Sequence, residues 1–289
     1  MLAGIRRVHK LPPMSADRTT RHLLHVGRPI TGGSACVSFL RAGRGAPVLL
    51  LHGFASDASE DWVGTGWFDA LVAAGFDVIA PDLRGHGQSM KSRDPADYRL
   101  EAFAGDAAAL CDHCWGDRRF SLIGYSMGAH VAMSVALGSA DRVVSLVLGG
   151  MGGRIAATVG LGPEFAEALD EQDDRSRDRR ELPSYAVRFR QHAATRPLND
   201  LAVLAACLRG QSGVFDLDRL LAVTAPTLVI VGEQDKLAGA PHPVAALFPR
   251  GVGETVPGVN HASALADDNF RKPVVTYLAR HRGDHDIES

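Results

Sequence analysis

A serine flanked by glycines follows a short apolar run in the middle of the chain. The sequence reads F-S-L-I-G-Y-S-M-G at 120–128 and continues with A-H-V-A-M-S-V-A-L at 129–137. This order predicts a strand, a tight turn and a helix, with the hydroxyl of Ser126 on the apex of the turn. Glycines at 124 and 128 leave room for a strained backbone that a Cβ atom would obstruct. The N–H groups of a helix N-terminus stabilise developing negative charge, so this position suits a nucleophile.

A serine hydroxyl is a weak nucleophile at neutral pH, so it needs a base, and the base needs a carboxylate that orients it. Asp235 follows the apolar run T-L-V-I-V at 227–231, and His261 follows the run E-T-V at 254–256. We therefore expect both side chains on loops after late strands, with His261 as the base. Glu233, two residues before Asp235, is the alternative acid.

Acyl transfer also needs two backbone N–H donors directed at the tetrahedral oxyanion, each worth about 2.7–4 kcal/mol. The residue after the nucleophile, Met127, would supply one donor. The other is expected from the loop after an early strand, and H-G-F at 52–54 directly follows L-L-L at 49–51. The N–H of Phe54 is therefore the second candidate donor of this oxyanion hole.

Apolar runs without alternation recur along the chain, as expected for parallel strands that are covered on both faces. They lie at 48–51, 78–80, 122–123, 146–148 and 228–231, and helix-like segments separate them at 67–74, 102–114 and 126–137. Segments 21–26 and 35–41 predict a leading antiparallel pair. The alternation favours an α/β fold with a doubly wound, mostly parallel sheet flanked by helices.

The segment from 151 to 215 breaks this rhythm, because it contains no convincing strand and carries a run of mixed charges at 170–181. We expect helices near 164–170, 184–193 and 200–208, which together would form a helical cap inserted into the core. The predicted organisation is an N-terminal extension (1–19), a core (20–150), the cap (151–215) and the rest of the core (216–289). The charge run is interpreted as a solvated face.

Five short motifs together resemble the α/β-hydrolase fold family of serine hydrolases over about 20–282. They are H-G-F at 52–54, D-L-R-G-H-G-Q-S at 82–89, G-Y-S-M-G at 124–128, G-E-Q-D at 232–235 and N-H at 260–261. The order Ser126, Asp235, His261 is the chain order of that family's triad, and the family's spacing favours Asp235 over Glu233 as the acid. Among its members the chain most resembles capped carboxylesterases, enol-lactonases and cofactor-free perhydrolases.

The resemblance implies a serine hydrolase that cleaves small to medium apolar esters or lactones through an acyl-enzyme on Ser126. C–C bond hydrolysis or perhydrolysis with the same triad, and ligand binding without turnover, stay open. Epoxide and haloalkane hydrolysis are disfavoured, because those relatives carry Asp at the position of Ser126. Four aromatic residues, Trp62, Trp67, Phe54 and Tyr125, are candidates for the substrate pocket, with core packing as the alternative for each. His52 is a further candidate. His52 is also expected to form hydrogen bonds beneath the oxyanion loop, and residues 82–89 to stabilise a turn.

The composition limits the remaining classes of function. A net charge of −2 gives no reason to expect nucleic acid or an anionic membrane as a partner. The Cys111–Cys114 spacing has no second ligand pair, so we expect no metal or other cofactor. Few cysteines, and no apolar segment after the basic residues 1–10, favour a cytoplasmic protein. We expect a small-molecule ester or lactone substrate and a monomer or homodimer. Met14 is an alternative start to Met1.

Overall fold

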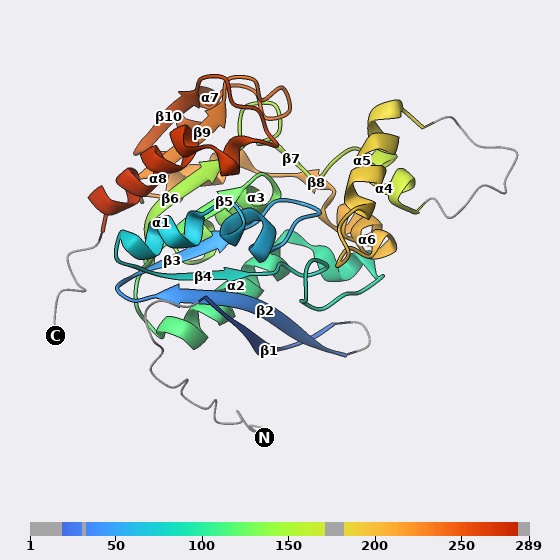
Figure 1. Ribbon diagram of the computed structural model, residues 1–289, viewed down its shortest axis with the longest axis horizontal. Coiled ribbons are helices and arrows are strands. Elements are labelled where there is room, and N and C mark those ends of the chain that lie inside the picture. The colour runs from blue at the N-terminus through green and yellow to red at the C-terminus, as the bar shows by residue number, and fades with distance from the viewer. Residues whose placement is uncertain (1–18, 31–32, 171–181, 283–289) are drawn as a thin grey trace, which may run out of the picture.

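The computed structural model describes residues 19–30, 33–170 and 182–282 (Figure 1). Within these ranges one eight-stranded sheet has the order β1-β2-β4-β3-β5-β6-β9-β10. Its strands are β1 (Thr20–Ile30), β2 (Gly33–Gly43), β3 (Ala46–Leu51), β4 (Phe76–Pro81), β5 (Phe120–Tyr125), β6 (Val143–Gly149), β9 (Thr227–Gly232) and β10 (Gly251–Val256).

Strands β1, β2 and β4 pair antiparallel with their neighbours in that order, and every pairing from β4 to β10 is parallel. The central strands are buried along their whole length because both faces of the sheet are covered. Parallel strands end at the same edge of the sheet, so the loops after β3, β5, β9 and β10 meet there.

Helices cover both faces of this sheet, and successive residues of β3 point to opposite sides. Leu49 and Leu51 belong to one core cluster with residues of α2 (Leu100–Trp115) and α3 (Met127–Gly138). Val48 and Leu50 belong to the other cluster, with residues of α1 (Trp67–Ala73) and α8 (Asp268–Arg280). The fold is therefore the expected doubly wound α/β sheet between helical layers.

A helical insertion separates β6 from β9. It contains α4 (Pro163–Asp170), α5 (Ser184–Ala194) and α6 (Leu201–Gln211), which Figure 1 shows grouped together to one side of the sheet. A two-stranded pair, β7 (Thr158–Val159) with β8 (Gly213–Val214), joins the beginning of the insertion to its end. The three helices lie where the sequence predicts them. Most of the charge run, 171–181, and the N-terminal residues 1–18 with both candidate start sites lie outside the described residues.

The last helix begins seven residues after His261. The chain after His261 first forms a short 3-10 turn, η4 (Ala264–Ala266), and α8 begins at Asp268. The side chain of Asp267 accepts a hydrogen bond from the N–H of Asn269, so this aspartate caps the helix. Short helices η1 (Ser59–Val63), η2 (Pro95–Tyr98), η3 (Leu217–Ala222) and α7 (His242–Ala245) complete the elements. None of the described helices is long and apolar enough to span a bilayer.

Candidate active site

Ser126 occupies the turn between β5 and α3 with a backbone that few residues adopt. Its φ of 53° and ψ of −112° place it in the left-handed half of conformational space, which is uncommon for a residue with a side chain. Its N–H donates to the carbonyl oxygen of Gly149 at the end of β6 (2.9 Å), and its own carbonyl accepts from Ala129 N–H (2.9 Å). These bonds hold the strained turn between the strand and the helix.

The two glycines of this turn are required by close packing of the helix against the sheet. A Cβ atom on Gly128 would lie 2.0 Å from the carbonyl oxygen of Leu51, and one on Gly124 would lie 2.2 Å from the carbonyl oxygen of Gly128. The glycines therefore let α3 approach β3 and β5 directly. This contact brings the N-terminus of α3 to the loop after β3.

His261 connects Ser126 with Asp235 through both nitrogens of its ring. His261 Nε2 lies 3.0 Å from Ser126 Oγ, and His261 Nδ1 lies 2.6 Å from Asp235 Oδ2. The side chain of Asp235 is 1% exposed and that of His261 is 25% exposed, so the acid is enclosed while the base is open to a substrate. With Nδ1–H donating to the carboxylate, Nε2 is free to accept the serine proton.

The other carboxylate oxygen of Asp235 is held by its own loop. Oδ1 accepts from the N–H groups of Leu237 (3.1 Å) and Ala238 (2.8 Å), so Oδ2 is directed at the imidazole. The alternative acid, Glu233, is exposed and accepts from Gly258 N–H at 3.1 Å. The geometry thus brings together Ser126, His261 and Asp235, and leaves Glu233 outside.

The loop after β3 presents the N–H of Phe54 near the N-terminus of α3. Within the described part of the chain neither this N–H nor that of Met127 has a hydrogen-bond partner. Asp61, on η1, braces the loop, because its carboxylate accepts from Gly53 N–H (2.8 Å) and from Ser56 Oγ (2.5 Å). Burial raises the pKa of Asp61. Phe54 and Met127 both line the cavity that contains Ser126, so their two N–H groups are the candidate donors of an oxyanion hole.

His52 supports this loop from below. Its Nδ1 donates to the carbonyl oxygen of Gly53 (2.7 Å), and its Nε2 accepts from the N–H of Leu83 (2.8 Å) in the turn after β4. The ring is fully buried and both nitrogens are occupied, so His52 has no capacity left for a substrate. These contacts support the expectation that His52 forms hydrogen bonds beneath the oxyanion loop, and not a place in the substrate pocket.

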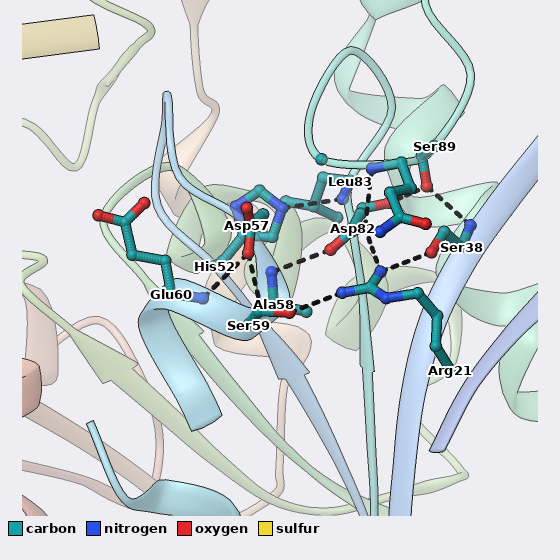
Figure 2. A network of polar contacts seen from close by, with 12 residues as sticks. Arg21, Ser38, His52, Asp57, Ala58, Ser59, Glu60, Asp82, Leu83 and Ser89 are labelled. Atoms are coloured by element: carbon teal, nitrogen blue, oxygen red, sulfur yellow. Dashed lines mark hydrogen bonds and ion pairs between the residues drawn. The ribbon is translucent and has the colours of Figure 1, made fainter. Parts of the chain in front are cut away.

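The turn after β4 forms hydrogen bonds that hold the next part of the loop after β3 (Figure 2). The buried carboxylate of Asp82 accepts from Ala58 N–H (3.0 Å) and from the guanidinium of Arg21 (2.5 Å), which also donates to Ser59 Oγ at 2.7 Å. Ser89 Oγ donates to the carbonyl oxygen of Asp82. Strand β1, the turn and η1 therefore form one polar network beside the site.

A small cavity opens beside Ser126 and has a volume of about 40 Å³. Its lining combines the oxyanion loop, the start of α3, the insertion and the loop after β9: Phe54, Ser126, Met127, His130, Ile155, Gly160, Leu161, Leu208, Gln211 and Leu237. A larger cleft of about 660 Å³ lies between α2, the end of α3 and the β8–η3 segment. That cleft includes none of Ser126, Asp235 and His261, so we place the substrate in the smaller cavity.

Three expected pocket residues do not line this cavity. Trp62 and His52 are completely buried, and the ring of Trp62 packs edge-on against Trp67 beneath η1. Tyr125 is 5% exposed, and its hydroxyl donates to the carbonyl oxygen of His261 at 2.5 Å. The prediction of pocket residues was therefore wrong for these three and for the buried Trp67, whereas Phe54 lines the cavity. Tyr125 instead fixes the loop that carries His261.

Most of the cavity-lining residues that the sequence did not predict come from the insertion. Leu161, Leu208 and Gln211 reach the cavity from separate segments of it, and no local motif marks them. His130 also lines the cavity, one helical turn after Ser126. Its Nε2 lies 3.1 Å from the carbonyl oxygen of Ile155, and burial lowers its pKa to about 4, so the ring is neutral at pH 7.

Other polar residues of the 82–89 motif stabilise the fold, as the sequence suggests. Arg84 forms a buried bidentate pair with Asp106 of α2, with distances of 2.9 and 2.8 Å. His86 is buried next to the rings of His52 and Phe54, and burial lowers its pKa to about 3. In the described ranges no group of three His, Cys, Asp or Glu side chains is placed to hold a metal ion.

Similar proteins agree with this architecture but differ in their reactions. The structure of a thermophilic esterase from Thermogutta terrifontis superposes on this one with a TM-score of 0.70 and 26% sequence identity. The superposition covers 91% of this chain and 100% of the esterase chain. A 2-hydroxymuconate semialdehyde hydrolase from Pseudomonas is 27% identical over 73% of this chain and 78% of its own length. Epoxide hydrolase B from Mycobacterium tuberculosis is 36% identical over 36% of this chain and 28% of its own length.

The chain spans about a third (32%) of the length of uncharacterized mycobacterial relatives to which it is 40% identical over 119 residues. A family model described as the alpha/beta hydrolase fold matches residues 46–201, which is more than half of the chain. The match includes β3 with its following loop and the turn that carries Ser126. The chain therefore belongs to the alpha/beta hydrolase fold family.

Proposed function

We propose that this protein is a serine hydrolase that cleaves carboxylic esters with a short acyl group through an acyl-enzyme on Ser126. The observation that carries the proposal is the continuous relay from Ser126 Oγ through His261 to Asp235, with distances of 3.0 and 2.6 Å. The likeness to an esterase at 26% identity over nearly the whole chain supports it.

In the proposed reaction His261 Nε2 takes the Ser126 proton as the hydroxyl oxygen attacks the ester carbonyl. The N–H groups of Phe54 and Met127 stabilise the resulting oxyanion. His261 then gives its proton to the departing alcohol, which leaves Ser126 acylated. Water repeats the sequence on the acyl-enzyme, releases the carboxylic acid and restores the serine.

The volume of the cavity limits the acyl group in this proposal. The cavity beside Ser126 is small, about 40 Å³, so the proposal assigns it a short acyl group of a few carbon atoms. Helices α4, α5 and α6 would act as the cap, because Leu161, Leu208 and Gln211 of the insertion line the cavity together with Ser126. We therefore expect propanoyl and butanoyl esters to be better substrates than long-chain esters.

Initial rates on p-nitrophenyl esters from acetate to decanoate test this proposal, with Ser126→Ala protein measured in parallel. We expect turnover that is highest at two to four acyl carbons, by the cavity volume, and that is lost in the variant. Equal rates for the two proteins would show that Ser126 is not the nucleophile. A maximum at octanoate or decanoate would contradict the assignment of the acyl group to this cavity.

A second candidate is the hydrolysis of a C–C bond with the same three side chains. It rests on the similarity to the 2-hydroxymuconate semialdehyde hydrolase, which extends over most of both chains. The two candidates separate when the protein is given 2-hydroxymuconate semialdehyde and p-nitrophenyl butanoate in parallel. A kcat/KM at least about a hundredfold higher for the semialdehyde would favour the C–C hydrolase.

A further inference from the structure

Gln211 is the last residue of α6 and brings an amide group to the cavity beside Ser126. Its side chain is 3% exposed and lies among the lining residues of that cavity. Gln211 also borders the larger cleft. Its Nε2, however, lies 3.3 Å from the sulfur of Met127, which lines the small cavity and not the cleft. The amide end of Gln211 therefore belongs to the site.

The hydrogen-bonding capacity of this amide is poorly used. The thioether of Met127 is a weak acceptor for Nε2, and Gln211 Oε1 is buried without a partner among the described residues. An unsatisfied buried acceptor destabilises the folded protein, so a ligand donor that pairs with it is favoured. The terminal torsion of a glutamine side chain is broad, so the oxygen can turn to meet a donor that enters the cavity.

Among the described residues that line the cavity, Gln211 is the polar residue with unused hydrogen-bonding capacity. Apart from Ser126, the other residues are apolar or glycine, except for His130. The Nε2 of His130 already lies within hydrogen-bond distance of the carbonyl oxygens of Ile155 and Ala156. Among the described residues no charged side chain lines the cavity at neutral pH, so a carboxylate on the acyl group would be desolvated without compensation. A neutral donor fits this environment.

We propose that Gln211 selects esters whose short acyl chain carries a hydroxyl group, which donates a hydrogen bond to Gln211 Oε1. This inference rests on the proposed esterase function and adds the substrate class. A hydroxyl is small enough for the cavity, is neutral, and can also accept from Nε2 of the same amide. A site built to hydrogen-bond a substrate hydroxyl discriminates against the analogue that lacks it.

Two pairs of phenyl esters of matched shape test the proposal. In the first pair 3-hydroxypropanoate replaces the terminal methyl group of butanoate with a hydroxyl, and in the second pair 2-hydroxypropanoate does the same for 2-methylpropanoate. Each kcat/KM is divided by the ester's rate of hydrolysis by hydroxide, which removes differences in intrinsic reactivity. We expect the wild type to favour the hydroxylated member of at least one pair about tenfold.

The Gln211→Leu and Gln211→Met variants remove the amide and keep the volume of the side chain. We expect both to lose the preference for the hydroxylated ester, measured as the ratio of the two kcat/KM values within each pair. We also expect an unchanged or higher melting temperature, because an apolar side chain replaces an unsatisfied buried acceptor. This measurement shows whether each variant is folded, independently of activity.

The outcomes distinguish this inference from the proposed function. If wild type and both variants have the same ratio within each pair, the inference is overturned, as it would be if resident water satisfied the amide. Hydrolysis of the plain esters would then still support the serine esterase. If none of the four esters is cleaved above the Ser126→Ala background, the proposed function fails and the inference fails with it.

Discussion

The side-chain nitrogen of Asn199 lies 3.1 Å from the carbonyl oxygen of Ala55 and joins the helical insertion to the loop after β3. The same nitrogen donates to the carbonyl oxygen of Ala193 at the end of α5 (3.0 Å). Ala55 follows Phe54 directly and has a φ of 59°, a strained value for a residue with a side chain. The ring of Phe54 also stacks on that of Phe189 in α5. The insertion thus helps to hold the proposed oxyanion loop.

Replacement of Asn199 by leucine should therefore lower kcat with little change in KM. Without the bond to its carbonyl, Ala55 can leave the left-handed region and displace the N–H of Phe54. Loss of one oxyanion donor costs about 10²–10³ in kcat, and a displaced donor should cost about tenfold or more. Steady-state kinetics on a short-chain ester measure the effect.

Two further variants make this test specific. Ala55→Gly in the Asn199→Leu background should restore part of kcat, because glycine adopts positive φ without strain. Arg93→Gln, which removes only the exposed pair with Asp200 at 3.6 Å, should retain wild-type kcat. Equal kcat values for Asn199→Leu and Arg93→Gln would show that the bond to Ala55 does not position the loop.

Asp235→Asn should reduce kcat by roughly 10⁴, because the amide no longer holds His261 in the tautomer that accepts the serine proton. The matched control is Glu233→Gln, on the same loop, whose carboxylate is exposed and points to Gly258. We expect this control to stay within about twofold of wild type. A large loss of kcat in Glu233→Gln with none in Asp235→Asn would show that Glu233, and not Asp235, orients His261.

The packing of α3 predicts opposite results for two glycine-to-alanine changes in one helix. Gly128→Ala would force its Cβ to 2.0 Å from the backbone of Leu51, so we expect a loss of at least about 3 kcal/mol or failure to fold. Gly138 has open space around its Cα, and Gly138→Ala should be neutral or stabilising by up to about 1 kcal/mol. Urea unfolding followed by circular dichroism measures both. Similar stabilities of the two variants would contradict the close approach of α3.

Buried neutral histidines should make the protein less stable as the pH falls below about 6.5. Burial lowers the pKa of His130 to about 4, whereas the unfolded chain takes up this proton near the ordinary imidazole pKa of about 6.5. Between these values the unfolded state binds more protons, so stability rises with pH and is lost on acidification. His130 alone contributes roughly 3 kcal/mol across this window, and His86 acts in the same direction to about pH 3.

Denaturant unfolding at pH 7.5 and pH 5 measures this dependence. His130→Gln removes one titrating group, so its stability should change less between the two pH values than that of the wild type. The same slope in both proteins would mean that His130 is not held neutral in the folded state.

The sequence predicted the parts of the site that depend on local order. Ser126 was predictable because a strand, a turn with two glycines and a helix succeed one another within a few residues. Asp235 and His261 were predictable because parallel strands deliver their following loops to one edge of the sheet. The bounds of β3, β5 and α6 also agree to within a few residues with the predicted segments.

The residues that line the cavity beside Ser126 could not be predicted from the sequence, and the reason is physical. Its walls come from residues such as Leu161 and Gln211, whose positions depend on how the insertion packs and not on any short pattern. An aromatic side chain near the site, such as Trp62, can be buried either in the core or against a ligand, and sequence alone does not distinguish the two. In the structure Trp62 is buried in the core. Which rings face a pocket is decided by tertiary packing.

The central claim is that Ser126 is an activated nucleophile, and labelling with a fluorophosphonate tests it most directly. Intact-protein mass spectrometry after incubation at pH 8 should show one adduct per chain in the wild type and none in Ser126→Ala. His261→Ala should react far more slowly, because the serine has lost its base. A wild-type protein that stays unlabelled, or an adduct that persists in Ser126→Ala, would contradict the account.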